Sequence, residues 1–273
     1  MAVRPENFDY VRDFVYRQAA IVLEPGKEYL VETRLGPIAR EEGFADTNDF
    51  IAAVKAESIP NGRHHRMVDA LTTNETFFFR DHHPWEAMRK EILPAVIERK
   101  RAARQLAIWS AACSTGQEPY SIAMMLRDGF PQLESWDVKI IATDLSERVL
   151  RQAAEGRYSQ FEVNRGLPAP LLVKHFTKVG NNWELKPEVR RMVTFRSLNL
   201  LAPFHSLPLC DVVCIRNVLI YFDVPTKRSI LDNIRRVLHP QGSLLLGGGE
   251  TTIGIHPGFS PIQHGSAMYF RQT

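Results

Sequence analysis

The sequence predicts an α/β fold, in which a doubly wound, mostly parallel sheet follows a small all-α N-terminal domain. Before residue 80, apolar residues recur at helical spacing and no segment has the pattern of a buried strand. After Arg104, short apolar runs alternate with helical patterns, which indicates a parallel sheet because parallel strands need crossover connections. A stretch at about 160–192 interrupts the alternation and predicts an inserted small β-hairpin subdomain.

The first 80 residues have the pattern of short helices. Residues 7–23 carry one apolar stripe, and further helices are expected at about 27–41 and 64–72. Thr47 is the expected N-cap of another helix, which carries Phe50, Ile51 and Val54. We expect residues 1–80 to form the helical domain and residues 81–104 to form a linker and a connecting helix.

The remaining residues, 105–273, should form the sheet domain. The expected strands are LAIWSAA (106–112), VKIIATD (138–144), VTFRSLN (193–199), DVVCIRN (211–217) and GSLLLGG (242–248). Helices are expected at about 117–127, after the cap Ser146 and at about 225–238. SPIQHGSAMYFRQ (260–272) has the pattern of a closing hairpin, and FTKVGNNWELKP (176–187) has two strand-like arms around a Gly-Asn-Asn turn.

The composition excludes several classes of protein. Of 273 residues, 44% are hydrophobic, and the net charge is only +3, so nucleic-acid binding is not indicated. No segment approaches the roughly 18 apolar residues of a membrane span, and we expect no membrane insertion. The 3 cysteines form no CxxC pair, which argues against a disulfide framework or a zinc cage and fits a reducing, cytoplasmic setting.

The carboxyl ends of the strands should carry the ligand site, because open α/β sheets bind ligands there. The first turn, SAACSTGQEPYS (110–121), has small residues, Gly116 among them, that would allow a close ligand approach, but it fails G-x-G-x-x-G and lacks a phosphate-binding Lys. Glu118 would repel a pyrophosphate and attract a cationic amino group. The turn therefore suits a positively charged nucleoside such as S-adenosylmethionine. The alternative is that Glu118 only complements the helix dipole.

Two other stretches hold candidate polar residues. Asp144 could accept hydrogen bonds from a ribose diol, or it could be a helix cap or turn residue. In LTTNETFFFRDHHPW (71–85), three consecutive Phe cannot all face one core, so some should line a cleft or a domain junction, with Asn74, Thr76 and Arg80 among them. The alternative is a capped helix start at Thr73 or Asn74, followed by core aromatic residues.

The histidine pairs His64–His65 and His82–His83 do not predict a metal site. Neighbouring side chains diverge, and no carboxylate lies at the spacing of H-E-x-x-H. We therefore expect solvated or interface histidines and no metal. Cys210 and Cys214 are expected to be buried apolar groups.

Six motifs, in this order, resemble those of the chemotaxis receptor methyltransferases, the CheR family. They are TTNETFFFRD, WSAACSTGQEPYSIAM, ATDLSERVLRQAAEGRYS, SLNLL, CIRNVLIYFD and GGGET. The resemblance covers essentially the whole chain. It implies a class I, Rossmann-like methyltransferase fold and methyl transfer from S-adenosylmethionine to glutamate side chains of chemoreceptors, with glutamyl methyl esters and S-adenosylhomocysteine as products.

The resemblance also implies the site residues. The cofactor contacts would be Asn74, Thr76, Arg80, Ala111, Glu118, Asp144, Asn199, Leu200, Asn217 and Val218. Arg80 and Tyr221 would be the catalytic residues, nearest to the methyl group and the incoming carboxylate. We expect Arg80 to orient cofactor or substrate, because a tight pair with a fully charged carboxylate favours the ground state.

The implied partners are the cytoplasmic signalling domains of chemoreceptors, and we expect a monomer. The acidic receptor bundle would face basic positions on the N-terminal helices: Arg34, Arg40, Arg63 and Arg66. Some members of the family dock a receptor pentapeptide as an added strand on the inserted subdomain, beside a longer glycine-containing loop. Here that loop is only GNN, which favours a member that works without the pentapeptide.

Other functions fit parts of the sequence less well. A methyltransferase for a small molecule or nucleic acid is the first, although RNVLIYF lacks the Asn-Pro-Pro-Tyr of DNA amino-group methyltransferases. A non-catalytic signalling module that binds S-adenosylmethionine or its product is the second, and intact Arg80 and Tyr221 argue against it. A nicotinamide oxidoreductase fits least, because the diglycine fingerprint is missing.

Overall fold

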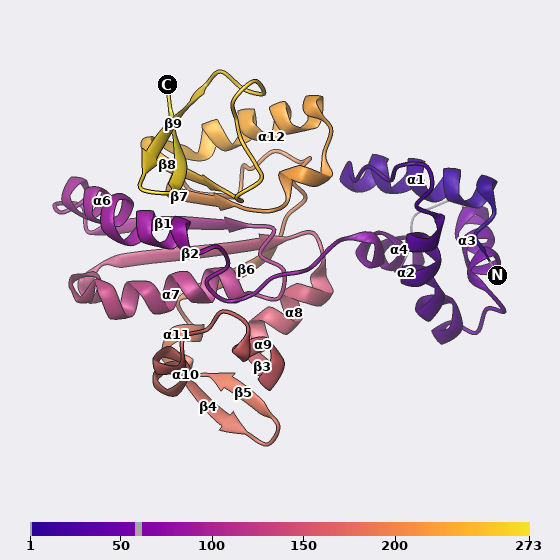
Figure 1. Ribbon diagram of the computed structural model, residues 1–273, viewed down its shortest axis with the longest axis horizontal. Coiled ribbons are helices and arrows are strands. Elements are labelled where there is room, and N and C mark those ends of the chain that lie inside the picture. The colour runs from indigo at the N-terminus through magenta and orange to yellow at the C-terminus, as the bar shows by residue number, and fades with distance from the viewer. Residues whose placement is uncertain (1, 58–61) are drawn as a thin grey trace. The chain divides into compact units, whose positions relative to one another are not determined.

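The computed structural model describes residues 2–57 and 62–273, and its chain divides into two compact units (Figure 1). The first unit comprises Met1–Thr73 together with Tyr221–Thr226, and the second comprises Asn74–Ile220 together with Lys227–Thr273. Segment 74–80 therefore belongs with the sheet, and a short segment after the fourth predicted strand belongs with the helices. None of the described helices is long and apolar enough to cross a membrane.

The first unit is helical, as the sequence predicts. Its helices are α1 (Pro5–Ala19), α2 (Glu28–Glu41), α3 (Thr47–Ala56) and α4 (Gly62–Leu71). They enclose a core because each buries one apolar stripe, for example Phe8, Val11 and Val15 of α1.

Two expectations for this unit are wrong in detail. The N-cap of α3 is Asp46, whose carboxylate accepts the backbone N–H of Asp49 at 3.0 Å. Thr47 is instead the first helical residue, and its hydroxyl donates to Glu32 of α2 at 3.0 Å. His64 is buried, not solvated, with its ring 5.0 Å from that of Phe14.

The second unit is built on a seven-stranded sheet of order β6-β2-β1-β7-β8-β10-β9. The first five strands of that order are parallel, and the last two form the antiparallel C-terminal hairpin that the sequence predicts. Their bounds are β1 (Gln105–Ala111), β2 (Asp137–Asp144), β6 (Val193–Ser197), β7 (Cys210–Ile215), β8 (Leu238–Leu246), β9 (Phe259–His264) and β10 (Ala267–Gln272).

Helices cover both faces of this sheet: α7 and α8 lie on one side and α12 on the other (Figure 1). The predicted connecting helix is the run α5 (His82–Ala87), η1 (Met88–Ile92) and α6 (Leu93–Arg99). The other helices after β1, apart from two in the inserted subdomain, are α7 (Gln117–Gly129), η2 (Pro131–Ser135), α8 (Glu147–Glu155), α11 (Pro187–Arg190), η3 (Leu219–Tyr221) and α12 (Val224–Val237). Ser146 caps α8 as predicted, accepting the N–H of Val149 at 3.2 Å. The arrangement is the predicted doubly wound fold.

A small antiparallel sheet of order β3-β5-β4 lies between α8 and β6, where the inserted subdomain is expected. The inserted subdomain comprises this sheet and two short helices: β3 (Arg157–Ser159), α9 (Gln160–Asn164), α10 (Ala169–His175), β4 (Phe176–Val179) and β5 (Asn182–Leu185). The hairpin of β4 and β5 is confirmed. The sequence misses β3 because three residues are too few to show an alternating pattern.

The cysteines Cys113, Cys210 and Cys214 are free and buried, which agrees with the expectation for Cys210 and Cys214. Burial raises the pKa of the Cys210 thiol to about 12. It also raises the thiol pKa of Cys113 and Cys214 well above the ordinary value. Because the thiolate is the nucleophilic form, none of these side chains is suited to attack a substrate.

Candidate functional site

The carboxyl ends of four neighbouring strands meet at one edge of the sheet. In the parallel register, Ala111 at the end of β1 is paired with Ile215 of β7 on one side and Thr143 of β2 on the other. Thr143 is in turn paired with Arg196 of β6. The turns that follow these strands therefore leave from one row. The strand ends, these turns and the first turn of α7 carry the predicted residues Glu118, Asp144, Asn199, Leu200, Asn217 and Val218.

Asp144 holds the turns after β1 and β2 together. One carboxylate oxygen accepts the N–H of Ser114 at 2.8 Å, and the other accepts the N–H of Ser146 at 3.0 Å. The sequence left open whether Asp144 is a turn residue, and the structure shows that it is. Each oxygen of an ionised carboxylate can accept more than one hydrogen bond, so a role in the turn is compatible with a contact to a ribose hydroxyl.

Gly116 serves internal packing, which corrects the expectation that its small size makes room for a ligand. Its φ is +91°, and a Cβ atom there would lie 2.9 Å from the Cβ atom of Ala153 in α8 and 3.2 Å from the Tyr158 hydroxyl. The glycine therefore lets α7 begin against α8. The small residues Ala112 and Ser114 reach the turn geometry differently, with left-handed φ angles of 52° and 50°.

Segment 74–81 is irregular, with a turn at 78–79, and no helix begins at Thr73 or Asn74. It is bound to the turn after β1, because the Ser114 hydroxyl donates to the Asn74 carbonyl at 2.7 Å. Further along, the N–H of Phe79 donates to the Ser121 hydroxyl of α7 at 3.0 Å. The aromatic motif of the sequence thus lies beside the crossover turn, as a shared cofactor site requires.

The three consecutive Phe side chains have three different surroundings. Phe78 is fully buried, with its ring 5.0 Å from the Tyr158 ring. Phe79 packs at 5.3 Å from Trp85. Phe77 is half-buried, and the guanidinium of Arg80 lies 5.4 Å from its ring centroid. This agrees with the expectation that the three cannot share one core.

Arg216 connects this segment to Glu118, and the sequence did not identify it as a site residue. Its side chain is only 3% exposed. One terminal nitrogen donates to Glu118 at 3.0 Å, and the other donates to the carboxylate of Asp81 at 2.9 Å and the carbonyl of Arg80 at 2.6 Å. The available signal was its position: Arg216 directly follows the fully buried strand β7, and buried charges are almost always paired.

This network changes the electrostatic role of Glu118. Its other oxygen accepts the Ser110 hydroxyl at 2.7 Å, so the carboxylate is held in place from both sides. The positive charge of Arg216 compensates one of the two negative charges of Glu118 and Asp81. These three side chains together therefore keep a net negative charge. A cationic ligand is still favoured, but less strongly than by an unpaired acid.

Arg80, Thr76 and Tyr221 are less constrained. The Arg80 guanidinium donates to the Glu75 carbonyl at 3.0 Å, and Thr76 lies in the same irregular segment. Tyr221 lies in η3 within the first unit, where its carbonyl accepts the N–H of Val22 at 3.2 Å. The catalytic roles of Arg80 and Tyr221 stay predictions.

Asn199 and Leu200 follow β6. The Asn199 side chain accepts the N–H of Leu201 at 3.0 Å, and Leu200 is buried. The N–H of Leu198 donates to the Asp144 carbonyl at 3.0 Å, which ties this turn to the end of β2.

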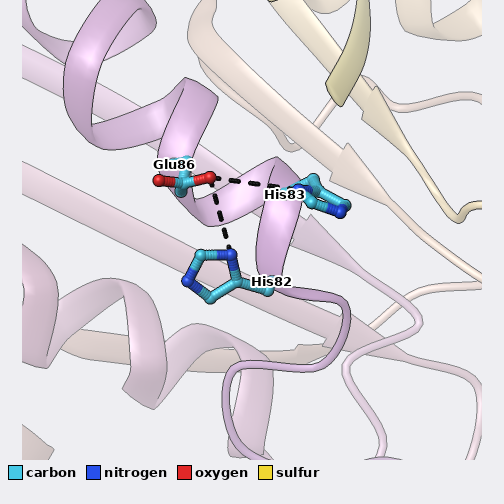
Figure 2. A group of neighbouring side chains, drawn as sticks. All are labelled: His82, His83 and Glu86. Carbon is cyan, nitrogen blue, oxygen red and sulfur yellow. Dashed lines mark ion pairs between the residues drawn. The ribbon is translucent and has the colours of Figure 1, made fainter. Parts of the chain in front are cut away.

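His82, His83 and Glu86 form a surface group on α5 (Figure 2). The two Nδ1 atoms lie 3.5 and 3.9 Å from one oxygen of Glu86, so Glu86 has the helical spacing that the sequence reasoning overlooked. The other oxygen accepts from Lys90 at 3.0 Å, and this hydrogen bond is the main reason that the pKa of Glu86 is lowered. All three side chains contact solvent, and the absence of a metal requirement stays a prediction.

Two family models match the chain in sequence. The all-alpha domain of CheR methyltransferases matches residues 6–72, and the S-adenosylmethionine-binding domain of CheR methyltransferases matches residues 74–266. The chain belongs to the CheR methyltransferase family. This confirms the class I methyltransferase fold and S-adenosylmethionine as the cofactor of this CheR chain.

Curated relatives resemble this CheR chain over nearly its whole length. Chemotaxis protein methyltransferase 1 of Pseudomonas aeruginosa is 37% identical over 99% of both chains. Chemotaxis protein methyltransferase Cher2 of Pseudomonas putida is 37% identical over 94% of both. A chemotaxis protein methyltransferase of Vibrio parahaemolyticus is 35% identical over 97% of this chain and 96% of its own.

Three of the four basic positions expected to face a receptor have partners within the helical unit. Arg63 and Arg66 each donate to Glu42 at 2.7 Å. Arg34 donates to backbone carbonyls at the end of α4. Arg40 is exposed. The electrostatic attraction expected of the first three is therefore partly compensated within the protein itself.

Proposed function

We propose that this CheR family member methylates glutamate side chains of chemoreceptor signalling domains, giving glutamyl methyl esters in sensory adaptation. The observation that carries the proposal is the match of both CheR domains, in order, along one chain whose relatives are named chemotaxis protein methyltransferases. The substrate itself, a receptor glutamate, is the step beyond the family.

The residues at the sheet edge fit the cofactor. Glu118 would bind the ammonium group, because its carboxylate is fixed by Ser110 and Arg216 in a net negative group. Asp144 would accept from the ribose, since a carboxylate oxygen that already accepts a backbone N–H can accept a further hydrogen bond. Asn74, Thr76, Arg80, Ala111, Asn199, Leu200, Asn217 and Val218 would complete the surroundings.

The proposed methyl transfer requires little proton transfer by the protein. A glutamate carboxylate, whose ordinary pKa is about 4.3, is ionised at neutral pH and needs no general base. S-adenosylmethionine, when bound, would supply the methyl group: the carboxylate oxygen would bond to its carbon while the carbon–sulfur bond broke and left its electron pair on sulfur. The chain's task is alignment and exclusion of water. We assign orientation to Arg80 and a hydrogen bond to the acceptor carboxylate to Tyr221.

The short connection between β4 and β5 supports a reaction that does not depend on a receptor pentapeptide. β4 pairs only with β5 in the order β3-β5-β4, so it is an edge strand to which a peptide could add. The turn between these strands is only Gly180 and Asn181, with Gly180 at a φ of +58°, and it offers little further surface beside that edge.

The test uses the full chain, radiolabelled S-adenosylmethionine and receptor signalling domains that end with or without the pentapeptide. We expect label on both kinds of receptor, released by mild base because carboxyl methyl esters hydrolyse under those conditions. Base-stable label would point to another acceptor atom. Label on no receptor, together with normal S-adenosylhomocysteine binding, would favour the non-catalytic signalling module. Label only on pentapeptide-bearing receptors would contradict independence from the pentapeptide.

A further inference from the structure

One carboxylate, that of Glu250, holds the whole turn that follows β7. One oxygen accepts the N–H of Asn217 at 2.7 Å and the N–H of Gly247 at 2.7 Å. The other accepts the N–H of Val218 at 2.9 Å and the N–H of Ile220 at 3.2 Å. An ionised carboxylate offers about four acceptor sites, so these backbone donors use its full capacity.

The turn that Glu250 holds has a conformation that needs support. Asn217 has a φ of +58°, which L-residues other than glycine rarely adopt. Gly247, at the end of β8, approaches it so closely that a Cβ atom there would lie 2.6–2.8 Å from the Asn217 side chain and backbone nitrogen. Since β7 and β8 are parallel neighbours, with Ile215 paired to Leu246, both ends of this contact belong to one sheet edge.

This turn carries several of the residues assigned to the reaction. Asn217 and Val218 are proposed cofactor contacts, and Ile220 directly precedes Tyr221 in the chain. The four donors that Glu250 accepts from are all backbone N–H groups. The carboxylate therefore fixes the path of the chain without hydrogen-bonding to the side chains of the turn.

We infer that Glu250 is a positioning residue for methyl transfer. It acts through the backbone of Asn217–Ile220. This backbone places the cofactor contacts Asn217 and Val218, and it places Ile220, the residue to which Tyr221 is bonded. The assignment to methyl transfer rests on the proposed function. The effect on cofactor binding does not, because it can be measured without any receptor.

The test compares Glu250→Gln with a matched control on the opposite edge of the same sheet. Asp211, at the amino end of β7, is likewise a carboxylate that accepts a backbone N–H, and it is buried: it accepts the N–H of Ala107 at 3.1 Å and pairs with Arg99 at 3.0 Å. Asp211→Asn removes a similar structural charge far along β7 from the turn. Calorimetry gives the Kd of S-adenosylhomocysteine and the melting temperature, and receptor methylation gives kcat and KM below both melting temperatures.

We expect Glu250→Gln to raise the Kd of S-adenosylhomocysteine about tenfold and to lower kcat about tenfold, because the amide oxygen serves at most two of the four donors. Asp211→Asn should lower the melting temperature but leave Kd and kcat within about twofold. The inference is wrong if Glu250→Gln leaves both constants within about twofold, or if Asp211→Asn changes them equally.

Glu250→Asp keeps the test decisive if the glutamine variant does not fold. Its carboxylate keeps the charge but is one methylene shorter, so we expect an intermediate Kd, raised about threefold. An unchanged Kd in this variant overturns the inference. If the wild-type chain methylates no receptor, the Kd measurements still decide the role of Glu250, and only the proposed function fails.

Discussion

At the scale of single residues, unusual backbone conformations gather in the segments assigned to the cofactor. Among the described residues, seven other than glycine have positive φ, and five of these are Phe79, Asp81, Ala112, Ser114 and Asn217. For Phe79, Ala112 and Ser114 such a conformation costs about 1–2 kcal/mol, while Asp and Asn adopt positive φ more readily, so the surrounding contacts must impose it on these three residues. Strain of this kind at a ligand site fixes side chains before the ligand arrives.

Arg80→Ala should lower kcat by about 100-fold, because misplacing the reacting groups has effects of that size. Arg80→Lys should remain strongly impaired, since the ammonium keeps the charge but loses the planar set of donors. The control is Arg101→Ala, whose side chain is 78% exposed and pairs only with Glu98 among the described residues. Methylation assays decide: near-normal turnover of Arg80→Ala would remove Arg80 from the mechanism.

The sequence predicted the polar residues of the site better than it predicted their partners. Glu118 and Asp144 follow from their places after apolar strands, which local pattern reveals. Arg216 and Glu250 act through contacts between segments about 98 and 33 residues apart, and no local pattern shows which groups will meet across such separations. The small size of Gly116 predicts room for a ligand, but a Cβ atom there would lie 2.9 Å from the Cβ atom of Ala153, so the glycine serves packing within the protein.

At the scale of elements, the beginning of α7 depends on its contact with α8. Gly116→Ala should destabilise the fold by about 2–4 kcal/mol, from a left-handed φ and a Cβ atom placed 2.9 Å from that of Ala153. Gly129→Ala in the same helix is the matched control: no atom lies within 4 Å of its added Cβ, so it should stabilise by about 0.4–1 kcal/mol. Calorimetry measures the melting temperature of both variants. A melting temperature of Gly116→Ala equal to that of the wild type would contradict the packing role of Gly116.

Helices and strands with a clear hydrophobic pattern were predicted well. Elements that depend on contacts between distant segments were not. The central parallel strands β1, β2, β7 and β8 contain continuous buried apolar runs, so their positions follow from the sequence. β3 (Arg157–Ser159) exists because it pairs with β5, and segment 74–81 stays irregular because Ser114 and Ser121 satisfy its backbone groups. Such pairings are set by tertiary structure, which a one-dimensional pattern does not contain.

At the scale of the whole molecule, the two units have separate cores. The second carries the cofactor turns, while the first carries the basic helices expected to meet an acidic receptor, together with Tyr221, to which we assign a hydrogen bond to the acceptor carboxylate. A change in exposed charge on the first unit should therefore affect receptor recognition and leave cofactor affinity unchanged. Because Arg34, Arg63 and Arg66 have partners within their own unit, replacing them would also disturb its structure.

Arg40 is the better probe, because it is exposed on α2. Arg40→Glu should raise KM for the receptor domain about fivefold at low ionic strength, with kcat and the Kd of S-adenosylhomocysteine unchanged, since like charges then oppose the encounter. The difference should shrink as added salt shortens the screening length to about 8 Å at 0.15 M. Arg101→Glu makes the same change in net charge on the second unit and should leave KM as it is. Equal KM values for the Arg40 variant and wild type at low salt would assign receptor binding to another surface, while equal increases in both variants would reduce the effect to net charge alone.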